Sequence, residues 1–443
     1  MGVKNNRLVF LSFVLLLIWA VSSLILLEQM PLDPPQVAAG QKKIKVLIRT
    51  GTESGALRQI STIFEKETGI KVEFTELGRD VYFTSVGTQL LAGTEAFDIV
   101  SVPNTSIAQF ASARAILPLD PFMQDTNLTD LDALDLDDFL AVYRYQGITY
   151  ALPTDISTHF LYYRSDLIPQ PPETWDELYK TALRFTKSIN SDSPTVWGLT
   201  MPAVAPEERT KIFASLLWSH GGDVLTEKEG NVQFDSIASI QAGEYLEKLI
   251  RQKIVPQDLL NWDFSRTREG LLMGEAAMAA PYWNAAYPMI KNSNSPFKDA
   301  IRIAMVPGIK DASGRITRVP FQHGWTLAIN ASSNHPLEAW EFIKFATGKR
   351  GGAVYARNGG VPARRSILGD VSFRETRPDF SLILETMGIA KNEPSVSYYP
   401  AMVDIEEKAL AKIVTMYESA KDSFSEAAQE LRQLTGRMNR NSR

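Results

Sequence analysis

The chain has no cysteine among its 443 residues. This absence excludes disulfides, thiolate metal sites, cysteine nucleophiles and a lipid-modified cysteine. It also suits an oxidising compartment. Positive charge is not in excess either, because 46 basic and 51 acidic residues give a net charge of −5. Since binding to phosphates needs clustered positive potential, this balance argues against a nucleic-acid partner.

Catalytic and metal-binding motifs are missing as well. The sequence contains no G-x-S-x-G, no H-E-x-x-H, no P-loop and no G-x-G-x-x-G. The acidic run from Asp130 to Asp138 lacks the glycine and the final glutamate of an EF-hand, so we interpret it as a solvated helix start. We therefore expect no enzyme, no metal and no cofactor, although sequence spacing leaves a pair of catalytic carboxylates open. The four histidines have no metal-ligand spacing: His159, His220, His323 and His335.

The overall composition is that of a globular protein. Hydrophobic residues make up 44% of the chain and charged residues 22%, which excludes a disordered chain, a collagen and a coiled coil. A chain of 443 residues is too long for one compact core and indicates two lobes.

The N-terminus carries one long uncharged run. Leu8–Leu27 contains 20 residues without a charge, and as a helix it rises about 30 Å, enough to cross a bilayer core. Two bases precede this run and two acids follow it, so the positive-inside rule places residues 28–443 outside the cytoplasm, in the periplasm or on the outer face of the membrane. We expect a cytoplasmic n-region over 1–7, a signal anchor or transmembrane helix over 8–27 and a stiff linker over 28–43.

Cleavage of this segment is the alternative. A signal peptide usually has an apolar region of about 7–15 residues, and the run here is longer. The nearest small-residue cleavage site ends at Ala39, well downstream. Cleavage there would give a soluble protein instead of an anchored one.

The exported body opens as alternating strands and helices. Strands are predicted at Ile44–Thr50, Ile70–Phe74 and Ala96–Val102, with a helix ending at Gly69 and another over Val81–Leu91. This order predicts parallel pairing with right-handed crossovers. In such sheets ligands bind beyond the carboxyl ends of the strands, where the same residue types also serve turns and caps. The candidates there are Thr52, Glu53, Arg79, Asp80 and Asn104.

Two motifs in the middle of the chain resemble a known family. Tyr150–Arg164 (YALPTDISTHFLYYR) and Pro171–Leu178 (PPETWDEL) resemble bacterial extracellular solute-binding proteins of the maltose- and oligosaccharide-binding class. The resemblance covers about 44–435. Further matches follow in the order of that family: Phe97–Val100, Leu117–Asp120, His220–Gly222, Gly274–Met278, Gly324–Asn330 and Val361–Arg364.

The resemblance implies an α/β architecture, the two-lobed periplasmic-binding-protein fold of type II. Its lobes are discontinuous and are joined by hinge strands, with a ligand cleft between them. The crossings are expected near Pro153–Thr158, Val319–Trp325 and Val361–Leu368. Lobe one is then 44–154 plus 324–364, and lobe two is 158–318 plus 369–443.

The resemblance also implies a function. The chain is expected to be a monomeric receptor of an ABC importer that binds a sugar or oligosaccharide and delivers it to permease subunits. Alternatives are a membrane-anchored sensor subunit that partners a membrane kinase, and an exported carbohydrate-active enzyme. A polyamine or a metal chelate stays open as the ligand, because a fold alone does not choose its ligand.

Tryptophans are the first candidates for a sugar site. Sugar rings have apolar faces and hydroxyl edges, so their sites stack aromatic rings on the faces and place polar groups around the edges. Trp283 follows a strand-like run and matches a tryptophan that stacks on sugar in several relatives. Trp325 lies at a crossing and Trp218 just before a glycine pair, whereas Trp175 and Trp340 are interpreted as packing residues.

Polar and aromatic neighbours complete the predicted site. Asp155 is favoured among them, because the Pro-Thr-Asp turn opens the first crossing. The remaining candidate ligand-binding residues are Tyr282, Asn284, His323 and Tyr398.

Overall fold

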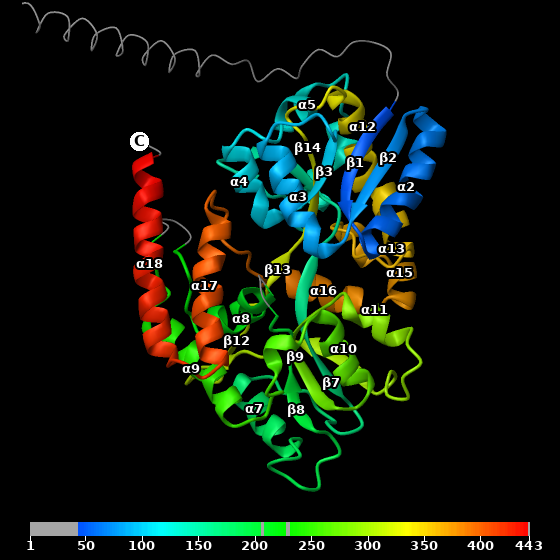
Figure 1. The fold of residues 1–443 in the computed structure, drawn as a ribbon. Helices are drawn as coiled ribbons and strands as arrows, with labels where there is room; N and C mark the ends of the chain where they lie inside the picture. Colours follow the sequence, from blue (N-terminus) through cyan, green and yellow to red (C-terminus); the bar gives the residue numbers. More distant parts are fainter. Residues whose placement is uncertain (1–42, 205–207, 227–230, 442–443) are drawn as a thin grey trace, which may run out of the picture.

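The computed structural model describes residues 43–204, 208–226 and 231–441, arranged as two lobes one above the other (Figure 1). The anchor expected over 8–27 lies outside these residues. Within the described ranges, no helix is both long and apolar enough to cross a membrane.

Lobe one is built on a five-stranded sheet with the order β2-β1-β3-β14-β6. The central β1 pairs in parallel with β2 and β3, as predicted, and β14 runs antiparallel between β3 and β6. The predicted limits were less accurate, because β2 continues three residues beyond Phe74 and β3 begins at Ile99 instead of Ala96. The strands are β1 (Lys43–Arg49), β2 (Lys71–Leu77), β3 (Ile99–Pro103), β6 (Ala151–Pro153) and β14 (Trp325–Ile329).

Helices cover both faces of this sheet. Gly69 ends the first of them in the left-handed conformation (φ 71°), which glycine adopts without strain. Trp340 is fully buried in the lobe-one core, as predicted, and Gly348 ends its helix. The helices of this lobe are α2 (Thr52–Thr68), α3 (Arg79–Leu91), α4 (Ile107–Ser112), α5 (Asp120–Gln124), α6 (Leu131–Leu134), α12 (Pro336–Thr347) and α13 (Lys349–Arg357).

Lobe two contains a second sheet with the order β10-β7-β9-β8, and β13 pairs antiparallel with the first two residues of β7. Its strands are β7 (Ser157–Arg164), β8 (Trp197–Thr200), β9 (Ala276–Trp283), β10 (Ile301–Met305) and β13 (Gln322–His323). Its larger helices are α7 (Trp175–Arg184), α8 (Glu208–Ser219), α9 (Ile237–Arg251), α10 (Phe264–Leu272), α11 (Ala286–Lys291), α16 (Asp379–Met387), α17 (Tyr399–Val414) and α18 (Ala420–Asn441).

A capping box opens α7 as predicted, with Glu177 N–H donating to the hydroxyl of Thr174.

Short elements connect the larger helices and strands. The short elements are η1 (Asn104–Ser106), η2 (Leu136–Asp138), η3 (Leu259–Asn261), β4 (Arg144–Tyr145), β5 (Ile148–Thr149), β11 (Ile309–Lys310), β12 (Ile316–Thr317), α14 (Arg365–Gly369) and α15 (Val371–Thr376).

Three chain segments cross between the sheets and are hydrogen-bonded to one another. The first joins β6 to β7 and the second joins β13 to β14. Asp155 in the first crossing accepts the backbone N–H of Trp325 in the second at 2.6 Å. The N–H of Ile156 donates to the carbonyl of Val361 in the third crossing at 2.9 Å.

The acidic run proved to be more than a solvated helix start. Asp130 does cap α6, but Asp138 is buried and accepts hydrogen bonds from the N–H and hydroxyl of Ser366. The fully buried guanidinium of Arg364 lies 3.6 Å from this carboxylate and donates to the carbonyl of Leu134. The run therefore anchors the third crossing, which explains why a buried arginine is tolerated there.

Candidate ligand-binding cleft

A cleft of about 630 Å³ opens between the two sheets, at the ends of their strands and along the crossings. This volume is in the range of sites for small organic ligands. Lobe one and the third crossing contribute Arg49, Gly51, Glu53, Phe83, Pro103, Trp325, Tyr355, Gly359, Gly360 and Val361. The other crossings and lobe two contribute Asp155, Ile156, Ser157, His323, Glu208, Lys211, Asp263, Phe264, Ser265, Trp283, Asn284, Ala285, Pro288, Met289 and Asn292.

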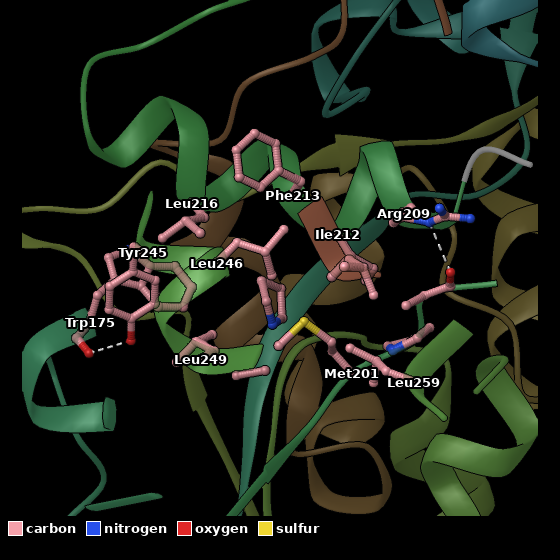
Figure 2. Close-up of a pocket in the computed structure, with 15 residues that line it drawn as sticks. Trp175, Met201, Arg209, Ile212, Phe213, Leu216, Tyr245, Leu246, Leu249 and Leu259 are labelled. Atoms are coloured by element: carbon pink, nitrogen blue, oxygen red, sulfur yellow. Dashed lines mark hydrogen bonds between the residues drawn. The ribbon is translucent and has the colours of Figure 1, made fainter. Parts of the chain in front are cut away.

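A second and much smaller cavity lies inside lobe two and has a volume of about 20 Å³ (Figure 2). Its walls are mostly apolar, with Ile212, Leu216 and Leu246 among them and Arg209 at one side. Such a volume holds roughly one water molecule. This cavity is therefore a packing feature beneath α8 rather than a ligand site.

Trp283 forms part of the lobe-two wall, where β9 ends. Its indole N–H donates to Glu208 Oε2 at 2.8 Å, which fixes the ring from α8. The rings of His159, Phe321 and His323 cross the indole plane at 67°, 83° and 61°, so none of these three stacks flat on it. The side chain is half-buried and borders the cleft.

Asn284 presents a hydrogen-bond donor beside this ring. The N–H of Thr158 donates to its side-chain oxygen at 3.0 Å, and its own N–H donates to the carbonyl of Thr158. The side chain is buried, and its Nδ2 has no partner in the described structure. Because the side-chain oxygen already accepts a hydrogen bond, the amide nitrogen is the polar atom of this side chain that still lacks a partner.

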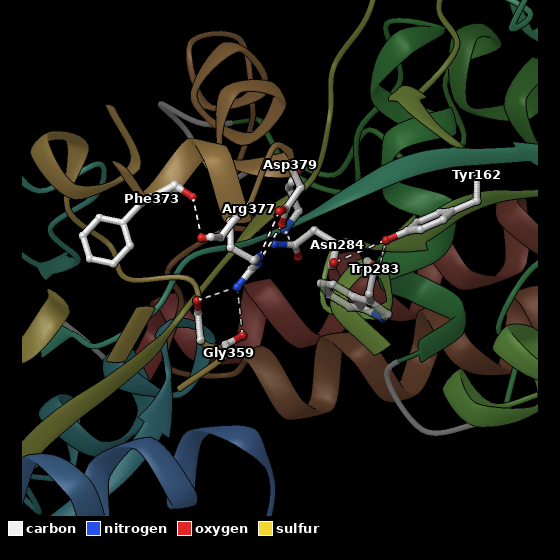
Figure 3. Close-up of polar contacts among 10 residues, drawn as sticks. Tyr162, Trp283, Asn284, Gly359, Phe373, Arg377 and Asp379 are labelled. Carbon is white, nitrogen blue, oxygen red and sulfur yellow. Dashed lines mark hydrogen bonds and ion pairs between the residues drawn. The ribbon is translucent and has the colours of Figure 1, made fainter. Parts of the chain in front are cut away.

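A polar network supports the backbone here and at the third crossing (Figure 3). The hydroxyl of Tyr162 donates to the carbonyl of Trp283 at 2.9 Å. In the same lobe, Arg377 pairs with both oxygens of Asp379 and donates to the carbonyl of Gly359, which precedes the third crossing, at 3.2 Å. These contacts fix the main chain at the end of β9 and tie lobe two to the third crossing.

Trp325 lies in the lobe-one wall, and its ring already has partners. It is 7% exposed, and the guanidinium of Arg49 lies 4.7 Å from its ring centroid. The rings of Tyr82 and Phe83 pack against it with centroid distances of 5.9 Å each. Arg49 also forms an ion pair with Glu53 at 3.5 Å.

Asp155 is 5% exposed and lies where the crossings meet. Burial, together with the nearby carboxylate of Glu53, raises its pKa to about 8, although the Trp325 N–H and Arg49 act in the opposite direction. At neutral pH this carboxyl therefore carries a proton. Burial and the same two carboxyls raise the pKa of the Tyr355 hydroxyl.

The two histidines near the cleft are neutral. Burial, reinforced by Lys211, lowers the pKa of His159 to about 3. Burial, reinforced by Lys211, Arg49 and His159, lowers the pKa of His323 well below its usual value. Neutral imidazoles can donate or accept a hydrogen bond, but they supply no charge to a ligand.

The cleft brings together six of the predicted residues and leaves four elsewhere. Those at the cleft are Glu53, Asp155, Trp283, Asn284, His323 and Trp325. Trp218 does not line it, because its ring stacks on Phe321 at 5.8 Å within the lobe-two core. Tyr282 is fully buried, and its hydroxyl donates to the carbonyl of Phe264.

Asn104 and Tyr398 are likewise not among the lining residues. The side chain of Asn104 is buried and accepts the N–H of Gly324, so it supports a crossing instead of facing the cleft. Tyr398 precedes the first residue of α17, and its side chain packs against the lobe-two core. The side chains of Thr52, Arg79 and Asp80 lie outside what the structure describes.

Several lining residues were not predicted. Arg49 ends β1, and the rule that ligands bind at strand ends could have indicated it. Glu208 and Lys211 come from the first turn of α8, and Tyr355 comes from α13. No strand end or recognisable motif marks these three positions.

Comparison with known proteins shows the family. Residues 49–353 match the model of the bacterial extracellular solute-binding proteins. The chain belongs to this family. Its members are substrate-binding proteins and not enzymes, and membership implies an extracytoplasmic location.

The relatives of this solute-binding protein are distant but extensive. A probable amino-acid ABC transporter periplasmic-binding protein of Sinorhizobium fredii is 24% identical over 418 residues, which cover 88% of this chain and 89% of the relative. The erythritol/L-threitol-binding protein of Mycolicibacterium smegmatis is 23% identical over 369 residues, or 76% and 73% of the two chains.

Solved structures give the same picture of the fold. Maltose-bound MalE3 of T. maritima has a TM-score of 0.77 at 26% identity, with 88% of this chain and 99% of that chain covered. An ABC transporter solute-binding protein of Agrobacterium radiobacter K84 in complex with ribitol also has a TM-score of 0.77, at 20% identity, and covers 91% and 100%. The expected two-lobed α/β fold is thereby confirmed.

Proposed function

We propose that this protein is the receptor of an ABC importer and binds a sugar or polyol in the cleft between its lobes. The observation that carries the proposal is the pair of Trp283 and Asn284 at the end of β9. The first offers a fixed aromatic ring and the second offers a preset amide donor. An apolar ring face beside a hydroxyl is what such a pair recognises.

The names of similar proteins support this ligand class. One relative is named for erythritol and L-threitol, and two similar structures hold maltose and ribitol. We further propose that Glu53, Asp155, His323 and Trp325 complete the polar and aromatic lining around the ligand.

The proposed mechanism is closure of two lobes around the ligand. We assign 44–154 plus 324–364 to lobe one and 158–318 plus 369–443 to lobe two. A ligand that contacts both lobes favours the closed state, because it gains contacts there that the open state lacks. Delivery to the permease subunits would follow from recognition of the closed form.

A thermal-shift screen tests the ligand class. Monosaccharides, disaccharides and four- to five-carbon polyols are added to the purified protein. A ligand at 100 times its dissociation constant adds about 2.7 kcal/mol of stability, so a true ligand raises the melting temperature clearly. Small-angle scattering should then show a smaller radius of gyration with the best ligand. If no sugar or polyol shifts the melting curve and an amino acid does, the proposal is wrong.

We also propose that the uncharged run at 8–27 anchors the protein at the membrane. The proposal rests on the length of that run and on the missing lipid-attachment cysteine. Full-length protein should then sediment with membranes and be released by detergent alone. A soluble species that begins near residue 40 would contradict it.

A further inference from the structure

Three oxygen-bearing side chains line the cleft: Glu53 and Tyr355 from helices of lobe one, and Asp155 from the first crossing. Tyr355 is 1% exposed, yet its hydroxyl has no hydrogen-bond partner in the described structure. Asp155 pairs with Pro362 in the third crossing, and the ring of Tyr355 lies against Gly360 two residues earlier, so both side chains belong to one part of the cleft. Burial and, to a smaller extent, both carboxyls raise the pKa of this hydroxyl. A buried hydroxyl without a hydrogen-bond partner lowers the stability of the fold unless a ligand or a water molecule supplies that partner.

The charges around this group do not balance if both carboxyls are ionised. Glu53 has Arg49 as its ion-pair partner at 3.5 Å. The titratable and charged groups that face Asp155 are Glu53, Arg49, Tyr143 and Tyr355. Arg49 is thus shared between two acids, and it also lies over the ring of Trp325. One more positive charge would balance the two carboxylates.

We propose that Glu53, Asp155 and Tyr355 bind a protonated amino group of the ligand. This inference rests on the proposed function and narrows it to an amino sugar or another compound with a primary ammonium. An ammonium has three N–H donors and no acceptor. The three side chains offer two carboxylates and a phenolic oxygen, so each donor finds an acceptor.

The protonation state of Asp155 makes the proposal measurable through proton release and the pH dependence of affinity. Burial and Glu53 raise its pKa to about 8, so the unliganded carboxyl keeps a proton at neutral pH. A bound ammonium favours the carboxylate, and the proton must leave when the ligand binds. Affinity for an amine should therefore rise with pH, up to about tenfold per unit between about pH 5.5 and 7. A neutral sugar displaces no proton from this group.

The test is isothermal titration calorimetry of the full-length protein with four probes: D-glucosamine, D-glucose, D-glucuronate and putrescine. Titration in buffers of different ionisation enthalpy measures the proton released. We expect glucosamine to bind at least tenfold more tightly than glucose, with proton release, and glucuronate to bind more weakly than both. Putrescine at the affinity of glucosamine would support the ammonium site and assign it to a simple amine.

Other outcomes would overturn the inference without deciding the proposed function. Equal affinity for glucose and glucosamine, or tighter binding of glucuronate, would exclude an ammonium site while leaving a sugar receptor. Binding of none of the four probes would also overturn it, and the sugar and polyol screen would then judge the proposed function separately.

Variants test whether Asp155 is the group that releases the proton when glucosamine binds. Asp155→Asn keeps an oxygen that can accept the Trp325 N–H but cannot ionise. It should remove the proton release and about tenfold of the affinity for glucosamine. The matched control is Glu73→Gln, which removes one negative charge from an exposed position on β2. Melting curves confirm that each variant is folded, and unchanged proton release in Asp155→Asn would refute the assignment.

Discussion

Trp325 and Trp283 lie in opposite walls of one cleft, yet their surroundings differ. Trp325 has a guanidinium over its ring at 4.7 Å and two aromatic rings packed against it. Trp283 is half-buried, and its neighbouring rings cross it at steep angles. Its indole N–H is held by Glu208. The first tryptophan already has its partners, whereas the second is fixed in place beside open space.

This difference suggests separate tasks for the two walls. Lobe one holds a buried ring, an ion pair and a protonated carboxyl, all linked to the crossings. Lobe two holds a fixed ring and a preset amide donor at the end of β9. We infer that Trp325 mainly stabilises the wall and that Trp283 mainly contacts the ligand. Substitutions can separate stability from affinity and so test the comparison.

The largest effect is expected for Trp325→Ala. Removal of a ring that is 7% exposed leaves a cavity under Arg49 and should lower the free energy of unfolding by about 3–5 kcal/mol. Chemical denaturation without ligand measures this loss. The substitution Trp197→Ala, at a half-buried ring in lobe two away from the cleft, serves as a size-matched control. A melting curve like that of the wild type would show that Trp325 is not a packing residue.

The next effect concerns pH and Asp155. Its pKa of about 8 in the folded state exceeds its value in the unfolded chain, so the folded state binds more protons between these two values. Stability from this group is therefore lost as pH rises, by about 3–4 kcal/mol between about pH 5 and 8. Asp155→Asn should remove this contribution to the slope of the free energy of unfolding against pH.

Glu406 in lobe two also contributes to the pH dependence of stability, and this contribution remains in Asp155→Asn. Burial, reinforced by Glu393, Glu407 and Asp223, raises the pKa of Glu406 well above its usual value. Denaturation of wild type and variant at both pH values gives the Asp155 contribution as the difference between the two slopes. Glu406 and the buried histidines, whose lowered pKa values act in the opposite direction, remain in the slope of the variant. Identical slopes in the two proteins would show that Asp155 is ionised in the folded state.

The sequence was sufficient to predict the fold, because many weak motifs in a fixed order constrain a topology jointly. The parallel β1, β2 and β3 and the buried Trp340 followed from periodicity and strand order. The strand-end rule also pointed to Glu53, which lines the cleft. Local patterns suffice for the strands and helices themselves, because their periodicity depends on neighbours in sequence, and the rule of right-handed crossovers then orders the strands.

The site was harder to predict, because it depends on contacts between distant segments. Trp218 was predicted at the cleft because it precedes a glycine pair. Its ring instead stacks on Phe321, which lies more than 100 positions away in the sequence. Conversely, Glu208 and Lys211 face the cleft from the first turn of α8, and nothing in their local sequence distinguishes them from a solvated helix start. Neither outcome could be read from spacing alone.

A smaller effect, on affinity, is expected for Trp283→Ala. Loss of an aromatic contact should weaken binding of the best sugar or polyol by about 1–3 kcal/mol, by analogy with other stacking sites. The ring is half-buried, so the ligand-free melting curve should move less than for Trp325→Ala. Calorimetry and melting are measured on the same preparation. Intact affinity with a collapsed melting temperature would reverse the roles of the two tryptophans.

The smallest effect should come from Glu208, which acts on the ligand through the ring that it holds. Its Oε2 accepts the Trp283 indole N–H at 2.8 Å. Glu208→Ala removes this acceptor and should weaken binding by about 1 kcal/mol, whereas Glu208→Gln keeps an acceptor oxygen and should cost less. Combining each with Trp283→Ala separates positioning from direct contact. If Glu208 works through the indole, the double variant binds no more weakly than Trp283→Ala alone, because there is no ring left to orient. Additive losses would instead mean that the carboxylate itself contacts the ligand, and lobe two would then contribute a charge as well as a ring.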